Sequence, residues 1–444
     1  MVAEQRKIEA RLSTFDTTMV VFSLVVGIGI FRTPAIVAGA AGSTPVFFAA
    51  WSIGGLISLL GALTFAEIGS RHPRAGGYYR VVADCYHPGL AFMLNWAQTL
   101  MQGAGAAGVA FIGADYLAPL LLPQSWQTPH ASLALACALM LLLLLLNFFG
   151  VRSGARTQNL LSMVKILMIV GLAALALALA PQAATVGVPP MTRWESRLAA
   201  ALVPCFYAYG GYQMTMNLGA DVKDARRGFP LAVTVGMLCV VALYLLINLA
   251  YQRALGTEAV AGSKLVAAAL SRAVFGPSGE ALVSIAIFLS AAGFVNATIL
   301  QMPRSLYAMA EDGVLPRVFL RVNPVTQVQE VGLLFFGATM LLPALLLGSF
   351  EKLLNYVLFT DALTLVVVAS TIFILRRRRS GEGGFRMPGY PLLPSIFILC
   401  LMGVAAHILA FETRLALVGV AIMLSGWPLF RLGRKLSEMI TPIE

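Results

Sequence analysis

Apolar runs of about 20 residues recur along the whole chain and are separated by short polar segments. A run of this length crosses roughly 30 Å of hydrocarbon as an α-helix, whereas a helix on a soluble core needs only one apolar face. The pattern predicts about twelve membrane-spanning helices, at residues 17–40, 46–70, 89–118, 131–149, 158–180, 199–220, 230–250, 280–310, 331–348, 353–375, 393–411 and 414–431. We therefore expect an all-α integral membrane protein.

Composition and charge agree with this class and add an orientation. The chain is 59% hydrophobic and 11% charged, while soluble domains carry about 25% charged residues. Lysine and arginine are about three times as frequent in alternate loops as in the others, which predicts that those loops are cytoplasmic. Residues 1–16 and 432–444 then form cytoplasmic tails of a protein in a bacterial inner membrane. The net charge of +11 sets this topology and meets anionic lipid, so we expect no nucleic-acid partner.

The residues that carry metal, redox or catalytic chemistry are sparse and scattered. Five cysteines and four histidines show no Cys-x-x-Cys pattern and no shared cluster. The chain has no glycine-rich phosphate-binding loop of the ATPase type and no grouped nucleophile and base. We expect no enzyme, no catalytic residue, no cofactor and no metal site.

Paired glycines interrupt two predicted spans near their centres. The first span reads VVGIGIFRTP from Val25 to Pro34, and the sixth reads CFYAYGGYQ from Cys205 to Gln213. Glycines favour close packing of membrane helices, but two glycines at spacing two do not share one helix face. The alternative is an unwound segment, and two unwound segments five spans apart fit inverted five-helix repeats. We expect these repeats at 17–180 and 199–376, followed by two further helices at 393–431.

An unwound segment inside a membrane helix suits a zwitterion. It exposes N–H groups at the start of the outer half-helix, where the helix dipole favours a carboxylate. It also exposes C=O groups at the end of the inner half-helix, and these accept hydrogen bonds from an ammonium group. An amino acid needs both at once.

Four motifs in their expected spans give the chain a family resemblance. They are GIGIFRTP, FAEIGSRHPRAGGYYR (Phe65–Arg80), YAYGGY (Tyr207–Tyr212) and GFVNATILQMPRSLYAMAEDGVLP (Gly293–Pro316). Over residues 10–435 the chain resembles the amino acid–polyamine–organocation superfamily, especially its L-type (light-subunit-like) transporters and their bacterial relatives. The resemblance implies a leucine-transporter-type 5+5 inverted repeat and sodium-independent secondary transport of amino acids, by exchange or proton-linked uptake. A polyamine or amine antiporter of the same fold is the alternative, with a channel or a membrane-embedded enzyme more remote.

The resemblance also implies roles for particular residues. Backbone N–H groups of Gly27, Ile28 and Gly29 would hold the substrate carboxylate. Carbonyls of Val25, Tyr207 and Gly210 would hold its amine. The segment Tyr207-Ala208-Tyr209-Gly210 would complete the site, with Tyr207 as an aromatic gate. The family usually has a small residue in place of Ile28, so we expect small substrates or a shifted pocket.

Three charged residues within or beside predicted spans complete the set of candidates. The resemblance implies that Lys165 stands where sodium-coupled relatives bind Na⁺, bridging carbonyls of the first span and the hydroxyl of Ser290; the alternative is a lysine that snorkels to the cytoplasmic surface. Asp361 either faces the cavity and binds a proton or a cationic substrate, or bonds to a neighbouring helix. Arg32 follows the first break and lies on the outward path.

The loop between the third and fourth spans, residues 119–130, contains no cysteine. Animal light subunits of the resembled family carry one there that links them to a heavy subunit. We therefore expect no disulfide-linked partner.

Overall fold

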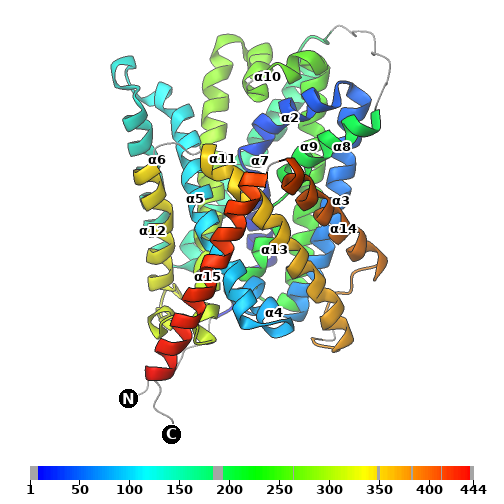
Figure 1. Cartoon of the computed structure of the whole chain (residues 1–444). Coiled ribbons are helices and arrows are strands. Elements are labelled where there is room, and N and C mark those ends of the chain that lie inside the picture. The colour runs from blue at the N-terminus through cyan, green and yellow to red at the C-terminus, as the bar shows by residue number, and fades with distance from the viewer. Residues whose placement is uncertain are drawn as a thin grey trace.

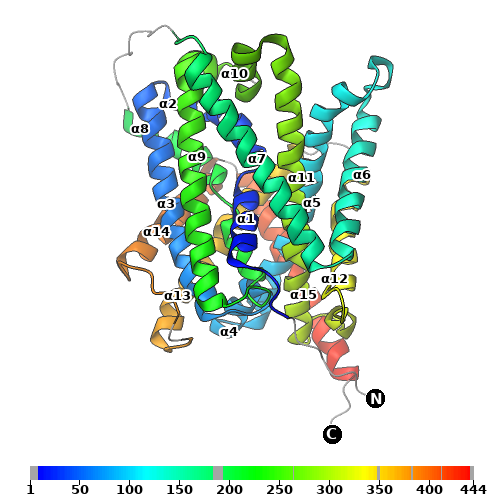
Figure 2. The ribbon, with the colours of Figure 1, turned by 180° about the vertical axis from the view of Figure 1, so that it is seen from behind.

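The computed structural model describes residues 9–183, 194–263, 265–347, 351–381, 384–411 and 413–440. The outer parts of the two predicted tails, residues 1–8 and 441–444, lie outside these ranges. The α-helices are α1 (Thr14–Val25), α2 (Gly29–Ala41), α3 (Thr44–Arg71), α4 (Gly77–Cys85), α5 (Pro88–Leu121), α6 (Pro129–Phe148), α7 (Val151–Leu179), α8 (Trp194–Ala208), α9 (Ala225–Ala261), α10 (Val266–Phe275), α11 (Gly279–Glu311), α12 (Glu330–Leu347), α13 (Glu351–Arg377), α14 (Leu392–Phe411) and α15 (Thr413–Ile440). Most of them run along one common direction, as Figures 1 and 2 show.

The prediction of an all-α membrane protein is confirmed. Nine of the described helices are long and apolar enough to cross a membrane, and the bent pair α1 and α2 makes a tenth. The other two predicted spans correspond to shorter helices. The apolar part of α12 covers Glu330–Leu345, and α8 ends after 15 residues at the second predicted break.

Two short helices occupy segments that the sequence analysis treated as loops. Helix α4 follows α3 at one end of the bundle, and α10 lies at the opposite end, before α11 (Figure 1). Neither helix is long enough to cross a membrane, so the pattern of long apolar runs does not predict them. Helix α4 buries Tyr78, Tyr79 and Val81 against the bundle, which makes it part of the core.

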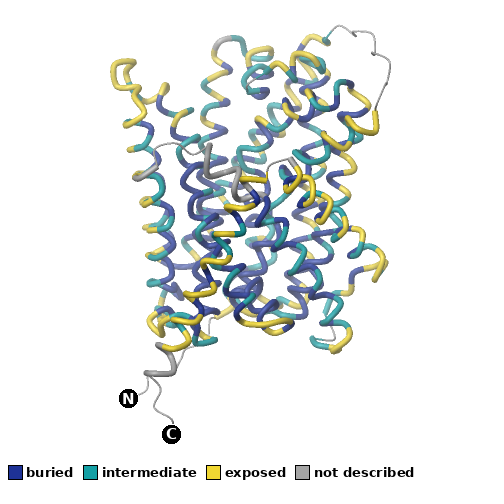
Figure 3. The backbone as a smooth tube through the Cα atoms, in the orientation of Figure 1, coloured by how far each residue is buried: buried dark blue, intermediate teal, exposed yellow. Residues whose placement is uncertain are grey.

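Burial is highest in the middle of the bundle and lowest on its outer faces (Figure 3). Helices α6 and α12 form one flank and α14 the other (Figure 1). On α6 the side chains of Leu141, Leu142 and Leu145 are each more than half exposed. An exposed apolar face of this kind is normal where lipid tails, rather than water, cover it.

Helix α1 lies inside the bundle and packs against α7, α9 and α11. The segment before it joins the segment that follows the second predicted break. Leu12 N–H donates to the Asp221 carbonyl at 2.7 Å, and Lys223 N–H donates to the Leu12 carbonyl at 2.8 Å. These bonds form an isolated parallel bridge between Leu12 and Val222.

Candidate functional site

The first predicted break is present between α1 and α2. Helix α1 ends at Val25, α2 begins at Gly29, and the two are bent by 46°. Val26 N–H still bonds to Phe22 O at 2.7 Å, which closes the last turn of α1. Within the described chain, the N–H groups of residues 28–30 have no backbone acceptor. The start of α2 therefore offers several N–H groups and a partial positive charge to an anion.

The second break lies directly against the first. Helix α8 ends at Ala208, and a 3₁₀ segment, η2, begins at Tyr212. Between them Gly211 has φ +115°, and a Cβ atom at this residue would lie 2.3 Å from the Leu24 carbonyl oxygen. Glycine is thus required here both for its conformation and for the close approach of two backbones.

Tyr244 of α9 joins the two breaks, a role that the sequence analysis missed. Its hydroxyl lies 3.1 Å from both the Val25 and the Ala208 carbonyl oxygens. The side chain is fully buried, and its single O–H proton is shared between the two acceptors. The available signal was a tyrosine inside the apolar run VALYLLIN, because a buried tyrosine hydroxyl needs a partner.

We expect Tyr244→Phe to lower the rate of substrate transport by about 2- to 12-fold, because a neutral hydrogen bond contributes about 0.5–1.5 kcal/mol. Phenylalanine keeps the ring packing and removes the bond that holds the two broken segments together. Initial rates in proteoliposomes measure the effect. Tyr251→Phe, on the same helix and also fully buried, is the matched control, since its hydroxyl has no hydrogen-bond partner among the described residues. Equal losses in both variants would contradict the role of Tyr244.

Lys165 of α7 contacts the end of α1 at the first break. Its Nζ donates to the Val26 carbonyl at 2.5 Å and lies 3.5 Å from Ser23 Oγ. The side chain is 1% exposed, so the ammonium is held inside the protein and does not reach the cytoplasmic surface. Gly293 of α11 leaves room for it, since a Cβ atom there would lie 3.2 Å from Nζ.

The hydroxyl partner of Lys165 in this structure is Ser23 of α1 rather than Ser290 of α11. Ser290 is fully buried, and its Oγ has no hydrogen-bond partner in the part of the chain that the structure describes. The predicted bridge from α7 to α11 is therefore not formed in this conformation. The ammonium instead joins α7 to α1.

Tyr207 and Tyr209, at the second break, make contacts with different helices. The Tyr209 ring packs edge-on against Trp51, and its hydroxyl donates to the Trp51 carbonyl at 3.2 Å. Its side chain is therefore part of the contact with α3. The Tyr207 ring packs beside Phe359 and Ala362 of α13, and its hydroxyl has no partner among the described residues. Of the two, Tyr207 is the one whose polar tip is free to meet a substrate.

The three carbonyls predicted to bind the substrate amine differ in the hydrogen bonds that they already accept. Val25 O accepts from the Tyr244 hydroxyl at 3.1 Å and from Gly27 N–H at 2.9 Å, so that this N–H is already bonded. Tyr207 O accepts from Gly210 N–H at 3.1 Å. Gly210 O accepts no hydrogen bond within the described residues. A carbonyl oxygen has two lone pairs, so Tyr207 O can accept one bond more, whereas both lone pairs of Val25 O are already used.

The remaining charged candidates are Arg32, in the first turn of α2 after the first break, and Asp361 of α13. Arg32 is exposed on α2. Its charge and the charge of Asp115 both act on the phenol of Tyr116. Asp361 of α13 is partly buried and accepts a hydrogen bond from Gln98 Nε2 of α5 at 2.7 Å. The contact with a neighbouring helix is thus formed.

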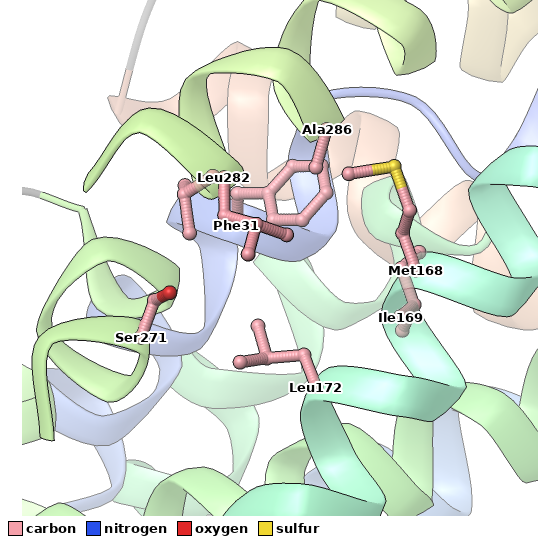
Figure 4. A pocket seen from close by; sticks show the side chains of 8 residues that line it. Phe31, Met168, Ile169, Leu172, Ser271, Leu282 and Ala286 are labelled. Atoms are coloured by element: carbon pink, nitrogen blue, oxygen red, sulfur yellow. The ribbon is translucent and has the colours of Figure 1, made fainter. Parts of the chain in front are cut away.

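A separate small pocket lies between α2, α7, α10 and α11, and Figure 4 shows its lining. Phe31, Met168 and Leu172 are among its mainly apolar side chains. The hydroxyl of Ser271, also in the lining, already donates to the Gly279 carbonyl. A zwitterion would find no charged partner in it, and none of the predicted site residues contributes to its wall.

Two helices broken side by side within an apolar bundle define a class of protein: secondary transporters whose substrate site is formed by discontinuous helices. The family comparison gives the particular family. The model of the family described as "Amino acid permease" matches residues 12–429, and the chain belongs to this family. The resemblance inferred from the four motifs is confirmed.

Curated relatives that align with most of this chain agree with the assignment to this family. The chain is 26% identical over 434 residues to the serine/threonine exchanger SteT of Bacillus subtilis (strain 168), covering 97% of this chain and 98% of that protein. It is 26% identical over 425 residues to the human large neutral amino acids transporter small subunit 2, covering 92% and 77%. The human cystine/glutamate transporter is also 26% identical, over 453 residues that cover 97% and 86%.

Proposed function

We propose that the chain carries amino acids across a bacterial cytoplasmic membrane by alternating access, as a sodium-independent exchanger or a proton-linked uptake system. The observation that carries this proposal is the pair of breaks that meet at Gly211 and Leu24. The free N–H groups at the start of α2 suit a carboxylate, and the carbonyls beside them suit an ammonium group. The relatives named above are transporters or exchangers of amino acids.

Sodium independence is supported by Lys165. Its Nζ donates to the Val26 carbonyl at the end of α1, where the protonated side chain would place one positive charge. A bound Na⁺ would supply the same charge to the same oxygen. With the lysine in place the broken helix needs no metal cation to balance its carbonyl end.

The expected orientation has both tails in the cytoplasm, in accordance with the distribution of lysine and arginine. The chain is also expected to work without a disulfide-linked subunit, since residues 119–130 contain no cysteine. Both points belong to the proposal. Accessibility of single cysteines introduced into the loops tests the first, and activity of the purified chain alone tests the second.

The test of the function is uptake of radiolabelled amino acids by proteoliposomes that contain the purified protein. We expect accumulation that needs amino acid inside the vesicles, for exchange, or an inward proton gradient, for symport, and that is the same in sodium and potassium buffers. Uptake that requires sodium would contradict the role given to Lys165. Transport of polyamines with no transport of any amino acid would contradict the proposal as a whole.

A further inference from the structure

Asp361 is a carboxylate within a membrane-spanning helix, and no cationic side chain of the described chain is paired with it. Two buried carboxylates elsewhere in the bundle are paired with arginine: Glu67 with Arg71 and Arg376, and Asp221 with Arg304. Within the described chain Asp361 forms no ion pair and has one hydrogen-bond donor, the Gln98 amide at 2.7 Å. A carboxylate without a cation in such a place is costly and is the first place to look for a bound group.

Several polar atoms around Asp361 also lack partners. The charge of Asp361 acts on the phenols of Tyr78, Tyr207 and Tyr212, which come from α4, α8 and η2. The hydroxyl of Tyr207 is buried and has no hydrogen-bond partner among the described residues. The hydroxyl of Tyr78 and the Oε1 atom of Gln98 are also buried and meet no partner at full hydrogen-bond geometry, although these two side chains interact with each other. Tyr78 and Gln98 are almost completely buried. Buried polar groups in native proteins are normally bonded, so this cluster is built for a ligand.

The chemistry of the cluster selects a cation with several N–H donors. The carboxylate and Gln98 Oε1 are acceptors, and phenol oxygens accept as readily as they donate. An ammonium group offers three donors and the missing positive charge. A neutral or acidic side chain would leave Asp361 without compensation.

The cluster is connected to the two breaks through Tyr207. This residue is the penultimate residue of α8, and it packs against a cluster that includes Phe359 and Ala362, the latter next to Asp361 on α13. An amino acid whose backbone groups bind at the breaks can therefore extend its side chain past Tyr207. We propose that Asp361 selects substrates whose side chain ends in an amine, such as ornithine and lysine. This inference rests on the proposed function, because it assigns the side-chain end of the same substrate.

The test compares lysine with norleucine, which has the same carbon chain without the terminal amine. In proteoliposomes of the wild-type protein we expect ornithine and lysine to compete with labelled substrate and to be transported, and norleucine to compete far more weakly. Asp361→Asn should weaken the apparent affinity for lysine and ornithine by about 10- to 150-fold, because a charge-assisted hydrogen bond is lost. Asp115→Asn is the matched control, since Asp115 is exposed on α5 and should leave the lysine preference unchanged.

The outcomes separate this inference from the proposed function. Equal competition by lysine and norleucine on the wild type overturns the inference without any variant, so a misfolded Asp361→Asn protein does not block the test. Transport of neutral amino acids that loses its proton dependence in Asp361→Asn would make Asp361 a proton site, which also overturns it. In both cases amino acid transport stands. Absence of all amino acid transport in the wild type would instead remove the proposed function.

Discussion

Replacing Gly211 with alanine is expected to abolish most transport, because the two breaks then no longer fit together. The added Cβ would lie 2.3 Å from the Leu24 carbonyl oxygen, and the residue would keep a φ of +115°. A non-glycine residue in such a conformation costs about 1–3 kcal/mol before any clash is counted. Since one or two kcal/mol is a factor of about 5–30 in an equilibrium, we expect a loss of at least that size.

Initial rates of amino acid exchange in proteoliposomes measure this effect, and thermal unfolding in detergent shows whether the bundle survives. Gly171→Ala on α7 is the control, because a Cβ atom at Gly171 meets nothing within 4 Å. The control should transport at the wild-type rate. If Gly211→Ala and Gly171→Ala were equally active, the close contact between the breaks would not matter for function.

Lys165→Ala is expected to lower turnover by about 10- to 150-fold, because it removes a charge-assisted hydrogen bond from the Val26 carbonyl. The carbonyl then stays buried without its partner, and the end of α1 loses the positive charge that balances it. Turnover in proteoliposomes is the measurement. Size-exclusion chromatography of the solubilised protein should be unchanged, because the lysine acts on the site rather than on the bundle.

The control for Lys165 is Lys223→Ala. Lys223 is exposed after η2, so its loss should leave turnover at the wild-type level. Unchanged turnover in Lys165→Ala would show that the contact with Val26 is structural only. Sodium dependence gained by Lys165→Ala would support the view that the lysine takes the place of a cation.

The class of fold and the positions of the breaks could be predicted because both depend on local sequence. Runs of apolar residues identify spans by length alone. Glycine pairs weaken a helix where they stand, and the helices do end at Val25 and Ala208. The short helices α4 and α10 could not be found in this way, since neither is long enough to cross the membrane.

The partners of the site residues could not be predicted, because they depend on how the helices are turned against one another. Lys165 was a candidate from its charge, yet its hydroxyl neighbour is Ser23 and not Ser290. On α11 a Cβ atom added at Gly293 would lie 3.2 Å from the ammonium nitrogen, whereas the Ser290 hydroxyl, three residues earlier, forms no hydrogen bond with it. Tyr244 was missed for the same reason, since nothing in its own segment shows that two carbonyls converge on it.

The bridge between Leu12 and Val222 has a mechanical consequence. It fastens the inner end of the first broken helix to the chain that leaves the second, so moving one without the other would cost two backbone hydrogen bonds. Asp221, in the same stretch, is held by Arg304 of α11 through two bonds of 3.1 and 3.2 Å. One buried ion pair and two backbone hydrogen bonds therefore hold these two segments together, and we expect the segments to move as one unit during transport.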